Sequence, residues 1–112
     1  MRYTTVADKA RTEGERGPYS TVQALWDAIY GAAREILAGP DGALQRRQYA
    51  RRARQAGSQS ETIYEAEARG LEEAFWTLYD WVHVCGPAEL AQELKALLRR
   101  YEQERQGQAM QD

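Results

Sequence analysis

The segment STVQALWDAIYGAAREILAGP, residues 20–40, shows the pattern on which the fold depends. Its apolar residues recur at steps of three and four, which places them on one side of an α-helix. Ser20 and Gln23 have the spacing of a capping box at a helix start, and Gly39 with Pro40 is typical of a helix end. We therefore predict an amphipathic helix over residues 21–38. Its apolar side comprises Val22, Leu25, Trp26, Ile29, Ala33, Ile36 and Leu37.

Gly-Pro dipeptides also divide the rest of the chain into helical segments, because each of its three prolines follows a glycine. After GPDG at 39–42, Asp41 is the expected cap of a second helix that runs to about Ala56. A third helix begins at GSQSE, capped either by Ser58, with Glu61 three residues later, or by Ser60. We expect it to end near residue 84, before the glycine and proline at 86 and 87.

A fourth helix is predicted from Pro87 to about Gln106, because proline suits a first helical turn. Its apolar stripe comprises Leu90, Leu94, Leu97, Leu98 and Tyr101. Residues 1–19 are expected to form an N-terminal arm, or a short helix over 5–13, and residues 107–112 a frayed tail. Short connections and the absence of alternating strand patterns predict an all-α fold, a compact antiparallel bundle of about four amphipathic helices in one domain, residues 1–112.

Composition limits the classes of protein to which the chain can belong. With 112 residues, 43% of them hydrophobic, and three Trp and seven Tyr, the chain is long enough and apolar enough to fold around one core. We find neither a secretory signal pattern nor an apolar run of the ~20 residues that span a bilayer, so we expect a cytoplasmic protein without membrane contact. Cys85 is the single cysteine; we expect a buried thiol, with a disulfide between two chains as the alternative.

The stretch LQRRQYARRARQ at 44–55 is strongly basic, although the whole chain has a formal net charge of -2. On a helix, Arg47, Arg51 and Arg54 fall on one side, and we call these three residues the arginine ridge. Arg46 and Arg52 flank a packing strip on the other side, made of Tyr49, Ala50, Ala53 and Ala56.

The arginine ridge has three interpretations. Arginine suits bidentate contact with phosphate, which indicates nucleic acid. An acidic protein partner would fit the same charge. The third interpretation, which we favour, is that the charge is solvated or paired within the chain, because residues 61–80 contain six acidic residues and one arginine.

No local pattern predicts catalysis. His83 and Cys85 point in nearly opposite directions on a helix, so they do not form a nucleophile and base pair. One histidine and one cysteine are too few for a closed zinc site, and Asp80 with His83 supplies only one arm of a di-metal site. The glycines form neither a dinucleotide-binding nor a P-loop motif. We therefore expect no enzyme activity, no cofactor and no metal; an enzyme without a local signature is the alternative.

The third helix contains an aromatic residue outside its expected core side. That side comprises Leu71, Ala74, Phe75, Leu78 and Val82, with Trp81 and Cys85 at its margin. Trp76 lies instead on a line with Glu72 and His83, close to Tyr79. Either another helix of the bundle covers Trp76, which we favour, or Trp76 belongs to an intermolecular surface, where Trp and Tyr are enriched.

The leading functional hypothesis is a small non-enzymatic interaction protein, such as a regulator, inhibitor or assembly subunit. It would bind a protein partner through Trp76, Tyr79, His83 and Glu72, and a homo-oligomer is one form that this binding could take. The alternative is a nucleic-acid-binding component, for example of a ribonucleoprotein, that uses the basic helix at 44–55. Its contact residues would be Arg46, Arg47, Arg51, Arg52 and Arg54.

Overall fold

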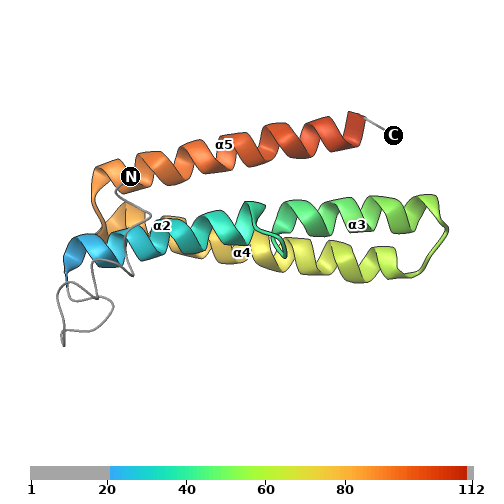
Figure 1. The fold of residues 1–112 in the computed structure, drawn as a ribbon, viewed down its shortest axis with the longest axis horizontal. Coiled ribbons are helices and arrows are strands. Elements are labelled where there is room, and N and C mark those ends of the chain that lie inside the picture. The colour runs from blue at the N-terminus through green and yellow to red at the C-terminus, as the bar shows by residue number, and fades with distance from the viewer. Residues whose placement is uncertain (1–20, 111–112) are drawn as a thin grey trace.

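A computed structural model describes residues 21–110 (Figure 1). This part of the chain forms four α-helices and no strand, which confirms the predicted all-α bundle. They are α2 (Val22–Ala38), α3 (Ala43–Gln55), α4 (Ser60–Cys85) and α5 (Ala88–Met110). The predicted N-terminal arm or short helix lies outside the described residues.

The four helices form three rows, because α2 and α3 lie end to end in one row and α4 and α5 each form another (Figure 1). Helices α2 and α3 follow one another in the same direction, α4 runs back beside both, and α5 runs forward again. Antiparallel neighbours, which we expected from the short connections, are found for α3 with α4 and for α4 with α5. The connection between α2 and α3 breaks the helix without reversing it.

The GPDG segment produces this break through close backbone contacts. Gly39 is extended (ψ 175°), as a residue before proline must be, so α2 cannot continue. The N–H of Gly42 donates to the carbonyl of Gly39 at 3.0 Å, and Gly42 is the N-cap of α3. The prediction that Asp41 caps this helix is therefore wrong: Asp41 instead lies 3.9 Å from Arg46.

The other helix ends agree only in part with the sequence. Thr21 caps α2 by accepting from the N–H of Ala24 at 3.0 Å, whereas the predicted cap Ser20 lies outside the described residues. Helix α4 has Gln59 as its N-cap, without a side-chain cap, so the prediction of Ser58 or Ser60 in that position is wrong. The hydroxyl of Ser58 accepts from the N–H of Ser60 at 3.1 Å. The carbonyl of Pro87 accepts from the N–H of Leu90 at 3.1 Å, so α5 begins directly after this proline.

Helix α5 is longer than predicted. It continues past Gln106 and Gly107 to Met110, so residues 107–110 are helical and not a frayed tail. The backbone carbonyl of Gln108 accepts a hydrogen bond from Arg51, a contact with α3 that the sequence of α5 alone does not show. Residues 111 and 112 lie outside the described part.

The core runs along the interior of the three rows. Its buried members are Ala33, Leu37, Ala43, Phe75, Val82, Leu90, Leu94, Leu97 and Tyr101. Helices α3 and α4 lie side by side, and the predicted packing strip is confirmed at Ala50 and Ala53, which are buried, as is Ala68 of α4. Tyr49 packs on Tyr64 with ring centroids 5.4 Å apart.

Five residues expected on apolar or buried sides are exposed. Val22 and Leu25, in the first turn of α2, are 67% and 36% exposed. Ala56 is the C-cap of α3, beyond the packed length of that helix. Ala74 lies one step, about 100° of helix rotation, away from the buried Phe75 and so misses the core. Cys85 is the last residue of α4 and is an exposed free thiol, not a buried one.

We expect Gly42→Ala to destabilise the protein by about 1–3 kcal/mol, the usual effect of forcing an added methyl group into a packed site. Its Cβ would lie 2.7 Å from the backbone carbonyl oxygen of Glu35. The matched control is Gly70→Ala, at an exposed position of α4 where no atom lies within 4 Å of the added Cβ. It should stabilise by about 0.5–1 kcal/mol, because alanine favours helix interiors.

Urea unfolding followed by circular dichroism measures both effects. If both substitutions changed the free energy of unfolding equally, the break between α2 and α3 would not depend on the close backbone contacts of Gly42.

Candidate functional site

Glu72, near the middle of α4, joins three helices. Arg47 of α3 donates to both of its carboxylate oxygens, from Nη2 at 2.7 Å and from Nε at 3.3 Å. From α5, the hydroxyl of Tyr101 donates to Oε2, and Nη1 of Arg105 donates to the same oxygen at 3.3 Å. We call these four residues the Glu72 network. Because the side chain of Glu72 is only 17% exposed, the charges in this network are partly shielded from water.

The Glu72 network changes the acidity of its members. Burial alone would raise the pKa of Glu72, but the hydrogen bonds from Arg47 and Tyr101 and the charge of Arg105 outweigh burial and lower it. Burial and the hydrogen bond to Glu72 raise the pKa of Tyr101. Burial would lower the pKa of Arg47, yet its contacts with Glu72 raise it. The folded state thus favours an ionised Glu72 and a protonated Tyr101.

The arginine ridge faces α4 and α5. Besides the pairing of Arg47 with Glu72, Nε of Arg54 lies 2.9 Å from Glu61 at the start of α4, and Arg51 donates to the carbonyl of Gln108. The neighbouring Arg46 lies 3.6 Å from Glu67, whereas Arg52 is exposed. Pairing within the chain, the interpretation favoured from the sequence, therefore holds for Arg46, Arg47 and Arg54.

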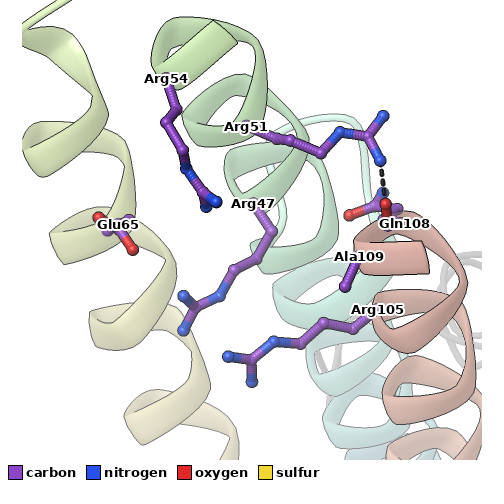
Figure 2. Close-up of a pocket in the computed structure, with 7 residues that line it drawn as sticks. All are labelled: Arg47, Arg51, Arg54, Glu65, Arg105, Gln108 and Ala109. Carbon is purple, nitrogen blue, oxygen red and sulfur yellow. Dashed lines mark hydrogen bonds between the residues drawn. The ribbon is translucent and has the colours of Figure 1, made fainter. Parts of the chain in front are cut away.

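A pocket of about 230 Å³ opens beside this ridge, between α3, α4 and the end of α5 (Figure 2). The three ridge arginines line it together with Arg105 and Gln108 of α5, and Glu65 lies on the α4 side. We call it the arginine pocket. Sequence reasoning missed the α5 contribution, because Arg105 and Gln108 are far from the ridge along the chain and were assigned to a helix end and a tail.

A second group of side chains follows Glu72 along the same side of α4. The ring of Tyr79 stacks on His83, with centroids 6.0 Å apart and an interplanar angle of 18°, and meets Trp76 edge-on at 5.6 Å. We call Trp76, Tyr79 and His83 the aromatic surface. These three predicted partner-binding residues are thus brought together, whereas Glu72 is held in its own network.

Helix α5 covers one part of this surface and leaves another open. Trp76 lines a small pocket of about 100 Å³ with Leu98 and Tyr101 of α5. It is nevertheless 45% exposed. Cover by another helix of the bundle, the alternative favoured from the sequence, thus holds for only a part of Trp76, and the intermolecular surface stays a prediction.

Another exposed indole lies nearer the end of α4. Trp81, which was expected at the core margin, is 44% exposed and packs against Trp26 of α2, with ring centroids 5.7 Å apart. The neighbouring Val84 is also exposed. The helical pattern of α4 places Trp81 at the core margin but does not show that it contacts Trp26 of α2.

The described residues, 21–110, contain no group of three or more His, Cys, Asp or Glu side chains placed to hold a metal ion. Within the same range, no helix is long and apolar enough to cross a membrane. His83 and Cys85, the residues weighed for nucleophilic catalysis, are both exposed. The prediction of a cytoplasmic, non-enzymatic protein stays a prediction.

Comparison of the chain with models of protein families, with curated proteins and with solved structures finds no match.

The lowered pKa of Glu72 predicts how stability depends on pH. A group whose pKa is lower in the folded state stabilises the fold above its ordinary value, here 4.5, and loses that contribution as the pH falls through the folded value. Glu72→Gln should therefore cost about 1–3 kcal/mol at pH 7, the cost of leaving buried donors unsatisfied, and the difference should shrink below pH ~4.5.

Chemical denaturation at a series of pH values between 7 and 3 measures this difference. Glu73→Gln is the matched control, because it removes the same charge from the exposed neighbouring position. A pH-independent cost of Glu72→Gln, or an equal effect of Glu73→Gln, would contradict the role assigned to the Glu72 network.

Proposed function

We propose that this chain is a small interaction protein, without enzymatic activity, that binds a protein partner through the aromatic surface of α4. The observation that carries the proposal is the 45% exposure of Trp76, in edge contact with Tyr79. Indole and phenol rings supply large contact areas at a low cost in conformational entropy, and they dominate the binding energy of protein interfaces.

The contacts within the aromatic surface support this function further. Tyr79 stacks on the buried Phe75, with ring centroids 6.4 Å apart, and on His83 at 6.0 Å. These neighbours restrict the rotamers of the exposed rings before a partner arrives, so that less entropy is lost on binding. A regulator, an inhibitor or an assembly subunit would use such a surface in the same way.

Nucleic-acid binding through the basic helix is less well supported. Three of the five arginines concerned, Arg46, Arg47 and Arg54, have carboxylate partners in the chain. A duplex or single strand would have to compete with these carboxylates, and the net charge of -2 gives no general attraction for a polyanion.

A binding measurement with two tryptophan variants tests the proposal. Proteins retained by the immobilised chain after nuclease treatment are identified, purified and titrated against the wild type, Trp76→Ala and Trp81→Ala. Trp81 is the matched control, because it is equally exposed but packs against α2. We expect Trp76→Ala to lose about 2 kcal/mol of binding free energy or more, roughly thirtyfold in Kd, and Trp81→Ala to bind normally.

Circular dichroism distinguishes loss of binding from loss of folding, and sedimentation of the chain alone shows whether the partner is a second copy. A folded Trp76→Ala variant that binds as the wild type does, or a variant that unfolds, would overturn the proposal. In the second case Trp76 acts as a core residue.

A further inference from the structure

Four arginines line the arginine pocket, Arg47, Arg51 and Arg54 of α3 and Arg105 of α5. The guanidinium groups of Arg47, Arg54 and Arg105 point toward the α4 side of the pocket, whereas that of Arg51 extends to the carbonyl of Gln108 (Figure 2). Two of these side chains keep substantial contact with water, since Arg54 is 59% and Arg105 46% exposed. The space, about 230 Å³, is therefore both positively lined and accessible to a small solute.

Three carboxylates of the described residues lie at the pocket or bind its arginines. Glu72 binds both Arg47 and Arg105, and Glu61 binds Arg54. Glu65 is the only acidic residue among the described residues that line the pocket itself. Each guanidinium has five N–H donors, of which Arg47 uses two on Glu72, so donors remain for an additional anion.

We propose that the arginine pocket binds the phosphoryl group of a small phosphate-bearing molecule. A phosphate carries up to two negative charges and accepts hydrogen bonds from several directions, which suits guanidinium forks that converge from two helices. Such a ligand would bridge α3 and the last turns of α5, next to the contact between Arg51 and Gln108. Arg105 also lines the small pocket beside Trp76, but the phosphate site uses none of the side chains of the aromatic surface and does not depend on the function proposed for it.

The lining favours a small phosphate compound over a nucleic acid strand. Proteins that hold single strands stack the bases on aromatic side chains, and the described residues lining the pocket include none. The space lies between α3, α4 and the end of α5 (Figure 2). The pocket therefore has donors for a phosphoryl group and lacks a platform for a base.

Glu65 gives the proposal a distinctive consequence. Its carboxylate lies on the α4 side of the pocket, opposite the arginines (Figure 2). A bound phosphate would be repelled by this charge, so Glu65→Gln should bind phosphate more tightly, roughly threefold for one charge several Å away in a hydrated pocket. A pocket whose arginines serve only the fold would show no such gain.

Titration of the full chain with inorganic phosphate and with pyrophosphate tests the proposal. Calorimetry and thermal unfolding are used at constant ionic strength, with chloride as the reference anion. We expect saturable binding and a rise in Tm, which a ligand specific for the folded state must produce. Arg54→Gln and Arg105→Gln should each weaken binding roughly tenfold, as expected for lost charge-assisted hydrogen bonds.

Arg52→Gln is the matched control, because Arg52 lies on the same helix and is exposed but does not line the arginine pocket. It should bind phosphate as the wild type does. No binding beyond that of chloride, or an equal loss in Arg52→Gln, would overturn the proposal. So would a preference for a single-stranded oligonucleotide over pyrophosphate, since it would indicate a nucleic-acid surface.

Discussion

The tertiary structure depends on one partly buried carboxylate. Glu72 accepts hydrogen bonds from Arg47 of α3 and from Tyr101 and Arg105 of α5, so one side chain of α4 fixes its position against two neighbouring helices. The ionised carboxylate of Glu72 is stable there only while its partners are present, because an unpaired ion that is shielded from water lowers the stability of the fold. The network therefore ties the register of α4 to that of α3 and α5.

Helix α4 uses one of its sides for two purposes. Glu61, Glu65 and Glu72 recur at spacings of four and seven residues, and the same line continues through Trp76, Tyr79 and His83. Along the first half, this line faces the arginines of α3, and along the second half it forms an open aromatic surface beside α5. Arg46, Arg47 and Arg54 of α3 thus have carboxylate partners within the chain, and the last two of them also line the arginine pocket.

Two features of the backbone place these sites. The break at GPDG lets α3 continue in the direction of α2, so the arginines lie beside the first half of α4 and not beside its aromatic half (Figure 1). The alanines Ala50, Ala53 and Ala68 then allow α3 and α4 to approach closely. A bulkier interface would move the arginines of α3 away from the acidic residues of α4.

The four helices can be predicted from the amino-acid sequence, because apolar spacing and the glycines and prolines between helices are local signals. The sequence also determines the packing strip at Ala50 and Ala53 and the opposite charges of α3 and α4. The pairing of charges depends on how the helices pack, since Glu72 is 25 residues from Arg47 and 33 from Arg105 along the chain. The tertiary structure also decides that α5 covers only a part of Trp76. Helical periodicity fixes the side of a helix on which a residue lies, but the neighbour on that side depends on how the helices pack.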